Sequence, residues 1–219
     1  FSWHKKIFKY AKKKKLICFS SPFDKSSVDL LESLKCPFYK IASPEITDLK
    51  LIDYVSKKKK PIIISTGIAD ENDINLAINQ CLKNNNKNII LLSCISSYPT
   101  DDTEVNIKNI NNLKKKVPHV GFSDHTVDTL APIIAVSMDA KIIEKHFMIS
   151  DKVVSHDKKF SISYNNFKVM VENIRRTEIQ KGISNPNKKK IINKKIKTIS
   201  RSLFYMCDLK KGSKIKHTD

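Results

Sequence analysis

"NIILLSC", residues 88–94, is the stretch that decides the fold. Its side chains are apolar nearly throughout, so a strand formed by it would be buried on both faces. Strands of that kind belong to parallel sheets covered by helices. "PIIIS", residues 61–65, repeats the pattern on the other side of an amphipathic segment. The two runs predict parallel strands joined by a helix, which is the unit of an α/β fold.

The same alternation of apolar runs and amphipathic segments extends over most of the chain. Strands are predicted at residues 16–20, 38–42, 61–65, 88–94, 119–122 and 140–145. Helices are predicted at residues 3–13, 26–34, 49–57, 71–83, 105–116, 128–138 and 165–180. Asp24 and Asp70 are placed to act as helix N-caps. Such an alternation forms either a doubly wound sheet or a (β/α)₈ barrel.

The residues at the ends of the predicted strands decide between these two folds. Every strand is followed by reactive or hydrogen-bonding side chains: Ser20 and Ser21, Lys40 and Ser43, Ser65 and Thr66, Cys94 with Ser96 and Ser97, Ser123 with His125, and Glu144 with His146. A doubly wound sheet binds its ligand mainly at one switch point, whereas all strand ends of a barrel meet at one mouth. The pattern therefore favours a (β/α)₈ TIM barrel with about six βα units present, so its first two strands are expected to be missing.

The character of the chain changes near residue 184. We predict a partial barrel domain at residues 1–183, a polar basic linker at 184–200, and the start of a second, small β domain at 201–219. "RSLFYMCDLKKGSKI" (201–215) predicts a strand, a turn at Lys211–Gly212 and another strand. The chain starts at Phe1 and stops abruptly after "KIKHTD", which indicates a piece of a longer protein. No apolar run is long enough to span a membrane and no signal-peptide pattern is visible.

The net charge of +19 raises the question of a nucleic-acid partner. Only three of the 41 basic residues are arginine, the residue that reads bases and phosphates best. The lysines lie in runs beside apolar segments, where they suit helix ends and loops. We therefore interpret the charge as a solvated basic surface, and keep a decayed or nucleic-acid-binding basic fragment as the non-enzymatic alternative.

Five cysteines, Cys18, Cys36, Cys81, Cys94 and Cys207, show no CxxC spacing. An odd number without such spacing suits a reducing cytoplasm. Cys94 lies inside an apolar run, where cysteine behaves as a small hydrophobic residue. A catalytic thiol at Cys94 is the alternative.

Two histidines and a lysine carry the predicted chemistry. His125 and His146 both lie at predicted strand ends, each near an acidic residue. Two imidazoles suit an open site for a divalent ion such as Mn²⁺, with Mg²⁺ and Co²⁺ as alternatives. Lys40 with several hydroxyl groups is suited to an anionic phosphate or carboxylate. The four glycines of the chain exclude Walker-type and Rossmann phosphate loops.

The motifs at these positions resemble those of the sialic acid synthase family, which includes the legionaminic and pseudaminic acid synthases. They are "SSPFDKSSVDLLESL", "FYKIASPEITDLKLI", "KPIIISTGIA", "SSYPT", "VGFSDHT" and "IIEKHF". "RSLFYMCDLKKG" resembles the opening of the family's C-terminal antifreeze-like (SAF) domain. The resemblance covers nearly the whole chain in order and implies a TIM barrel followed by a truncated SAF domain. "KFSI" and "SRSLF" favour the pseudaminic and legionaminic branch.

The resemblance implies a cytoplasmic transferase of nonulosonic acid biosynthesis that supplies surface glycans. It condenses phosphoenolpyruvate with an N-acylated amino-sugar aldehyde and releases phosphate by C–O cleavage. The family's metal would be held by His125 and His146. Phosphoenolpyruvate would be bound by Lys40, Ser43, Ser65, Ser123 and Ser21. The sugar would contact Glu45, Tyr98 and Asp157, and the expected catalytic residues are His125, His146, Glu45 and Lys40. Family members are homodimers in which the SAF domain reaches the partner's barrel.

Four positions depart from the family pattern. Asp128 and Asp139 stand where the family usually has glycine, Ile95 replaces a threonine, and Ser93 replaces a basic residue. Asp tolerates the left-handed backbone region better than most residues. The two aspartates beside the metal strand indicate a relaxed or decaying copy, and the changes at Ile95 and Ser93 bear on sugar specificity more than on metal binding. The resemblance implies that the missing first strands carry an acid and a lysine of the same mouth, so this stretch alone is expected to be inactive. A Schiff-base lyase using Lys40 or Lys145 is the enzymatic alternative.

Overall fold

The computed structural model describes residues 2–150, 152, 154–182, 201 and 204–217. The chain divides into two units, Phe1–Lys181 and Gly182–Asp219. The predicted linker, residues 184–200, lies outside the described residues. None of the helices in the described part of the chain is both long and apolar enough to cross a membrane.

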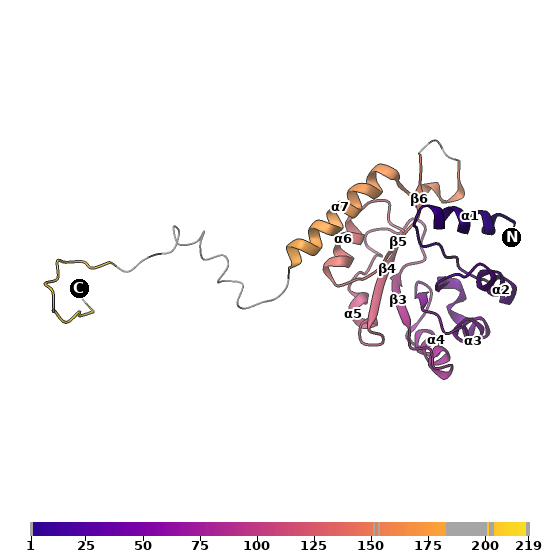
Figure 1. Cartoon of the computed structure of the whole chain (residues 1–219), viewed down its shortest axis with the longest axis horizontal. Coiled ribbons are helices and arrows are strands. Elements are labelled where there is room, and N and C mark those ends of the chain that lie inside the picture. Colours follow the sequence, from indigo (N-terminus) through magenta and orange to yellow (C-terminus); the bar gives the residue numbers. More distant parts are fainter. Residues whose placement is uncertain (1, 151, 153, 183–200, 202–203, 218–219) are drawn as a thin grey trace. The chain divides into compact units, whose positions relative to one another are not determined.

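The first unit alternates strands and helices as the sequence predicts (Figure 1). The strands are β1 (Tyr39–Ile41), β2 (Ile62–Ser65), β3 (Ile89–Cys94), β4 (His119–Asp124), β5 (Ile143–Lys145), β6 (Phe147–Met148) and β7 (Ile162–Ser163). The helices are α1 (Ser2–Lys13), α2 (Lys25–Ser33), α3 (Leu49–Ser56), α4 (Glu71–Lys83), α5 (Asn109–Leu113), α6 (Leu130–Ser137) and α7 (Tyr164–Lys181), with 3₁₀ turns η1 (Ser43–Thr47) and η2 (His156–Phe160). Asp24 and Asp70 accept amide hydrogen bonds at the starts of α2 and α4, which confirms both predicted caps.

The sheet has the order of a barrel and not that of a doubly wound fold. Strands β1 to β5 are parallel and pair in sequence order. In a doubly wound sheet the strand order would reverse at a switch point. The ammonium group of Lys40 on β1 lies 3.5 Å from the carboxylate of Glu144 on β5. These strands are the two edges of the sheet, so the sheet curls far enough for its edges to approach each other.

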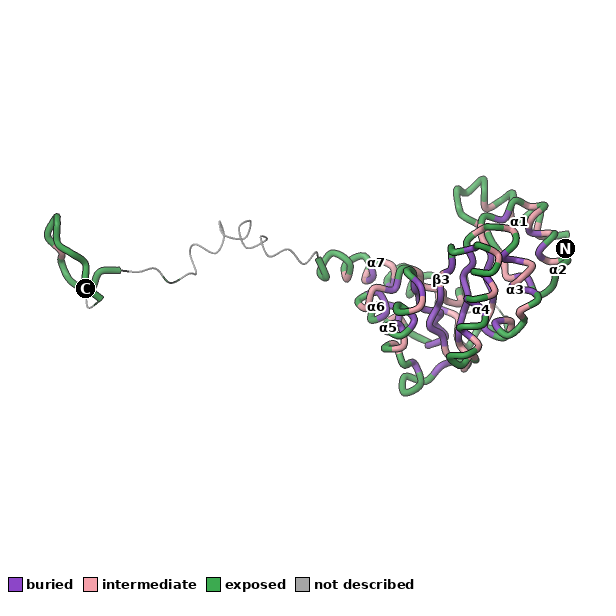
Figure 2. Tube along the Cα trace, turned by 90° about the horizontal axis from the view of Figure 1, so that it is seen from below, coloured by how far each residue is buried: buried purple, intermediate pink, exposed green. Residues whose placement is uncertain are grey.

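Alternate strand residues face different surroundings. Tyr39, Ile41 and Ile64 belong to the core between sheet and helices, and so do Leu91 and Phe122. The residues between them face the concave side. Strands β1 to β4 are buried along nearly their whole length, as parallel strands covered on both faces should be. Figure 2 shows these buried segments between helices whose outer faces are exposed.

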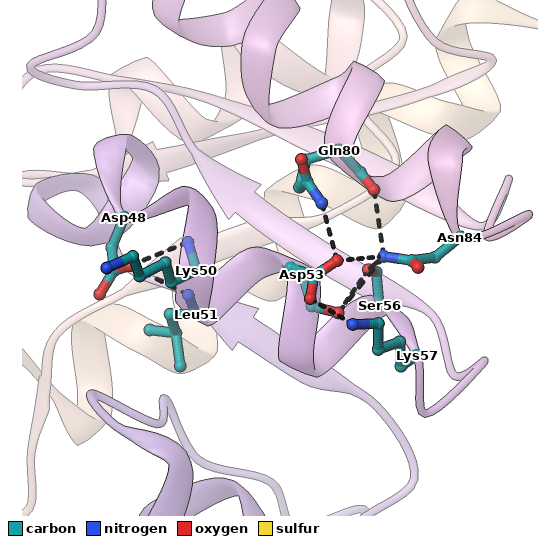
Figure 3. A network of polar contacts seen from close by, with 8 residues as sticks. All are labelled: Asp48, Lys50, Leu51, Asp53, Ser56, Lys57, Gln80 and Asn84. Atoms are coloured by element: carbon teal, nitrogen blue, oxygen red, sulfur yellow. Dashed lines mark hydrogen bonds and ion pairs between the residues drawn. The ribbon is translucent and has the colours of Figure 1, made fainter.

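The outer layer is held together by polar contacts between α3 and α4 (Figure 3). The side-chain amide of Asn84, after α4, donates to the carboxylate of Asp53 at 2.9 Å and to the hydroxyl of Ser56 at 2.7 Å. Gln80 donates to the same carboxylate at 2.8 Å. Asp48 caps α3 by accepting from the amides of Lys50 and Leu51. The network fixes the helix pair that packs behind β1 and β2.

Three sequence predictions of local structure were wrong. Residues 16–20 are irregular rather than a strand, because an apolar run becomes a strand only where a neighbour completes its hydrogen bonds. Helix α5 covers five residues of the predicted 105–116. In the second unit the described residues contain the turn at Lys211–Gly212 but no strand. So short a segment buries too little apolar surface to support an isolated hairpin.

One strand pair was not predicted. β6 continues β5 after a break at His146 and pairs in parallel with β7. The amide of Ile162 donates to the carbonyl of His146 at 2.8 Å. The two strands form a separate small sheet. Because His146 lies between the two strands, the alternation of a regular strand does not fix the direction of its side chain.

Candidate active site

A cavity of about 370 Å³ lies at the carboxyl ends of the strands. It is lined by Ser21, Lys40, Ala42, Ser43, Pro44, Ser65, Cys94, Tyr98, Ser123, His125, Glu144, Lys145 and His146. The predicted site residues are all among them except Glu45 and Asp157. Residues from distant parts of the sequence thus meet at one mouth, as expected for a barrel.

Lys40 is a buried cation of this cavity, beside Lys145, which is paired with Asp124. Its neighbours Tyr39 and Ile41 face the helices, so Lys40 points to the concave side, where it is 5% exposed. Its ammonium group donates to the carbonyl of Ile41 at 3.2 Å. The carboxylate of Glu144, 3.5 Å away, also accepts a 2.7 Å hydrogen bond from Ser123. A buried cation with a single carboxylate nearby can still bind an anionic ligand.

The serine hydroxyls supply further hydrogen-bonding groups. Ser43 accepts from the amide of Ile68 at 2.9 Å and from the hydroxyl of Ser96 at 3.1 Å. The hydroxyl of Ser65 is buried and has no hydrogen-bond partner among the described residues. Buried polar groups are normally paired, so this hydroxyl is available to hydrogen-bond a ligand.

Gly67 makes room beside these serines. A Cβ atom there would lie 2.3 Å from the hydroxyl of Ser96 and 2.9 Å from that of Ser43. A larger residue at this position would force these hydroxyls to move.

His125 follows β4 and is held in one orientation. Its Nδ1 lies 2.7 Å from the carbonyl of Ile95, which can only accept, so Nδ1 carries the proton and Nε2 is left as a possible ligand atom. Burial lowers the pKa of His125, and the nearby His146 lowers it further. The neutral imidazole is the form that binds metals.

Two residues of η2 contact the ring of His146 and orient it. Its Nδ1 lies 3.4 Å from a carboxylate oxygen of Asp157, and the ring of Phe160 meets its ring edge-on at 4.8 Å. Asp157 lines a second, adjoining cavity that also includes His146. The ring of Tyr98 lies 4.0 Å from that of His125. The histidines are thus enclosed by aromatic rings and one carboxylate.

The two imidazoles fit an open metal site. Their ring centroids are 5.5 Å apart. Because imidazole nitrogen binds a divalent ion at about 2.0–2.1 Å, rings at this spacing can reach one ion. Among the described residues, no group of three or more His, Cys, Asp or Glu side chains is arranged to hold an ion. Water or substrate oxygens would have to complete the coordination.

Two of the alternative nucleophiles, Cys94 and Lys145, are poorly suited to attack a substrate. Burial raises the pKa of the Cys94 thiol, which disfavours the reactive thiolate. Lys145 forms an ion pair with Asp124, and both side chains are almost fully buried. An ammonium group held in such a pair has no free electron pair with which to attack a carbonyl.

The chain was compared with known families and proteins. The profile of the NeuB family matches residues 1–185. The chain belongs to the NeuB family. This confirms the resemblance to the sialic acid synthases drawn from the motifs.

Curated relatives support the same grouping. The chain is 41% identical to a pseudaminic acid synthase of Helicobacter pylori, over 96% of this chain and 62% of the relative. It is 39% identical to an N,N'-diacetyllegionaminic acid synthase of Campylobacter jejuni, over 95% of this chain and 64% of the relative. The chain thus spans less than two thirds of the length of these NeuB-related proteins.

A solved structure supports the barrel fold. The N-acetylneuraminic acid synthetase of Leptospira borgpetersenii, in complex with citrate, superposes with a TM-score of 0.83 at 27% identity. The match covers 89% of this chain and 68% of the other. The parallel sheet with sequential strand order is therefore part of a TIM barrel, as predicted.

Glu144 and Phe160 are two side chains of the site to which sequence reasoning gave no role. The sequence placed Glu144 among the strand-end side chains that meet at the mouth of the barrel, but gave no contact for it there. Phe160 gave no such signal, because its position depends on the path of the loop before η2. Glu45, in contrast, does not line the cavity, although one of its carboxylate oxygens is buried without a hydrogen-bond partner among the described residues.

The two aspartates at glycine positions of the NeuB pattern differ from each other. Asp139 has a φ of 75°, in the left-handed region. Asp128 is not among the residues with positive φ, and it accepts a 2.9 Å hydrogen bond from the amide of Leu130 at the start of α6. The expected loss of backbone freedom therefore applies to Asp139 alone.

Asp139 gains compensating contacts from Lys114 and Lys181. Hydrogen bonds from Lys181 and Lys114 lower its pKa to about 2. Because the folded pKa lies below the unfolded value of about 3.9, its charge stabilises the fold above pH 4, and this contribution is lost as the pH falls toward 2. The side chain is 46% exposed, so we expect less than about 1 kcal/mol.

The measurement is the difference in unfolding free energy between the wild type and Asp139→Asn from pH 6 to pH 2. Asn keeps the tolerance for positive φ and removes the charge. We expect the difference to shrink toward zero near pH 2. A difference that stays constant with pH would contradict the assigned ion pairs.

Proposed function

We propose that the protein is a nonulosonic acid synthase, which condenses phosphoenolpyruvate with an N-acylated amino-sugar aldehyde and releases phosphate. The observation that carries this proposal is the cavity itself. It combines a buried lysine, four serine hydroxyls and two imidazoles at the mouth of a NeuB-family barrel. The names of the relatives, pseudaminic and N,N'-diacetyllegionaminic acid synthase, favour a 2,4-diacetamido-trideoxyhexose over N-acetylmannosamine.

The proposed binding of phosphoenolpyruvate follows from the charges. Lys40 and the hydroxyls of Ser43 and Ser65 offer a cation and donors to phosphate and carboxylate oxygens. Ser21 and Ser123 extend this set. Lys40 would stabilise the charge on phosphate as its C–O bond breaks. The free hydroxyl of Ser65 would gain its missing partner on binding.

The amino sugar would occupy the histidine side of the cavity. Tyr98 lines this side, and Asp157 reaches it through the adjoining cavity. The aldehyde carbon has to come within about 3–3.5 Å of the enol carbon, so these side chains contribute by positioning. A role for Glu45 requires its carboxylate to turn toward the cavity.

A divalent ion, Mn²⁺ in the first place and Mg²⁺ or Co²⁺ otherwise, is proposed as the cofactor. His125 and His146 would hold it, and when bound it would supply a Lewis acid for the sugar carbonyl. The orientation of His125 by Ile95 and of His146 by Asp157 resembles the outer support common to metal-binding histidines.

Three further proposals rest on the family. Residues 201–219 would begin an SAF domain, and the whole protein would form a homodimer in which this domain reaches the partner's barrel. A cytoplasmic location agrees with five cysteines that are all unpaired.

The test is phosphate release from phosphoenolpyruvate by the protein expressed from its complete gene. Mn²⁺ would be supplied with N-acetylmannosamine or with either 2,4-diacetamido-2,4,6-trideoxy hexose of the pseudaminic and legionaminic pathways. We expect release with one trideoxy sugar, its loss with chelator, and its loss in His146→Ala. His119→Ala is the matched control, because His119 is exposed at the opposite end of β4. A folded, Mn²⁺-binding protein that releases no phosphate with any sugar would refute the proposed reaction.

A further inference from the structure

Asp124 and Lys145 form a buried ion pair directly before the two histidines. Asp124 ends β4 and is followed by His125; Lys145 ends β5 and is followed by His146. The two are Cα partners in the parallel register. Their side chains are 0% and 1% exposed. Neither has a part in the proposed chemistry.

The pair belongs to a closed network that encloses His125. Lys145 also donates to the carbonyl of Thr126 at 2.7 Å. Thr126 donates to Asp124 through its amide at 3.0 Å and through its hydroxyl at 3.2 Å. The backbone on both sides of His125 is therefore tied to the ammonium group of the residue before His146.

Other contacts leave each histidine anchored to a different neighbour. The carbonyl of His125 accepts from the amide of Thr100, and its ring is tied to Ile95. The carbonyl of His146 accepts from Ile162 on β7. The network of Asp124, Lys145 and Thr126 links the two anchors at the point where the strands end.

Stability is a weak explanation for such a pair. Burying two charges costs desolvation free energy that their attraction barely repays, and neutral side chains of similar volume are often as stable. What neutral side chains do not reproduce is a fixed geometry, because the ammonium group directs separate hydrogen bonds to Asp124 and Thr126.

We propose that Asp124 and Lys145 are positioning residues, which hold His125 and His146 at the spacing that one divalent ion requires. The inference rests on the proposed use of a metal by this site. It assigns no catalytic step to either residue. It explains why a carboxylate precedes His125 and an ammonium group precedes His146.

The test is the equilibrium affinity for Mn²⁺, measured by titration without phosphoenolpyruvate or sugar. The double variant Asp124→Asn/Lys145→Met removes both charges and leaves none unpaired. We expect cooperative unfolding as stable as that of the wild type, with Mn²⁺ bound about tenfold more weakly. The single variant Lys145→Arg keeps both charges of the pair and should bind Mn²⁺ nearly as tightly as the wild type.

A matched control is Asp139→Asn/Lys114→Met, which removes a surface ion pair in the same way and should leave Mn²⁺ affinity unchanged. Histidine ring NMR signals give a second readout. In the double variant, signals of His125 and His146 should broaden or shift in the absence of metal, while those of His119 stay in place. If the double variant does not fold, Thr126→Val gives the same comparison, because it removes the hydroxyl hydrogen bond to Asp124 without leaving a charge unpaired.

The outcomes separate this inference from the proposed function. Unchanged Mn²⁺ affinity in the folded double variant would overturn the positioning role and leave the synthase proposal intact. No Mn²⁺ binding by the wild type would overturn the metal assignment and this inference together. Weaker Mn²⁺ binding by the double variant, with nearly wild-type binding by Lys145→Arg, would support the positioning role.

Discussion

Lys40→Met is expected to lower kcat/KM for phosphate release by about a thousandfold. Methionine keeps the buried apolar stem and removes the cation. Without it, the carboxylate of Glu144 faces the cavity with Ser123 as its remaining hydrogen-bond partner and repels the trianionic substrate. Losing one strong donor to a developing oxyanion costs about 10²–10³ in rate, and the loss of a full charge should reach the upper end. Steady-state phosphate release at saturating sugar measures the effect.

Lys60→Met is the matched control. Lys60 is half-buried, pairs with Glu32 and lies before β2, at the opposite end of the strands. The Lys60→Met variant should be less stable than the wild type and keep its kcat/KM. Borohydride with pyruvate should leave the wild type unmodified, because the proposed reaction forms no Schiff base. A trapped adduct at Lys40, or wild-type turnover by Lys40→Met, would contradict the assigned role.

The barrel could be predicted because its information is local. Ile62, Ile64 and Leu91 recur with the spacing of strands buried on both faces, and Asp70 marks the start of α4. The strand predictions that failed are those that depend on pairing with another strand. Residues 16–20 have the composition of a strand but no strand partner among the described residues. Phe147 and Ile162 pair although fourteen residues separate them in the chain, and no periodicity reveals such a pairing.

The site was predictable to the extent that it follows strand ends. Lys40, Ser65, Ser123 and His125 meet in the cavity because parallel strands bring their carboxyl ends together. The curl of the sheet was not predictable in the same detail. It brings Glu144 of one edge to Lys40 of the other, and no spacing in the sequence encodes that distance.

Gly121→Ala is expected to destabilise the barrel by about 3 kcal/mol. A Cβ atom at Gly121 would lie 2.5 Å from the carbonyl oxygen of Ile142 and 2.5 Å from the side chain of Leu92. The carbonyl is backbone and accepts the 2.8 Å hydrogen bond from Phe122, so it cannot move without opening the junction of β4 and β5. Forced overpacking of this kind costs about 1–3 kcal/mol, and the lost hydrogen bond adds to it.

Urea unfolding followed by circular dichroism measures this loss. The control is Gly212→Ala, where a Cβ would meet nothing within 4 Å and the residue lies in the other unit. It should leave barrel unfolding unchanged. Because His125 directly follows β4, the strand that contains Gly121, the folded fraction of Gly121→Ala should also bind Mn²⁺ more weakly. If Gly121→Ala unfolds like the wild type, β4 and β5 must lie farther apart near Ile142 than the structure places them.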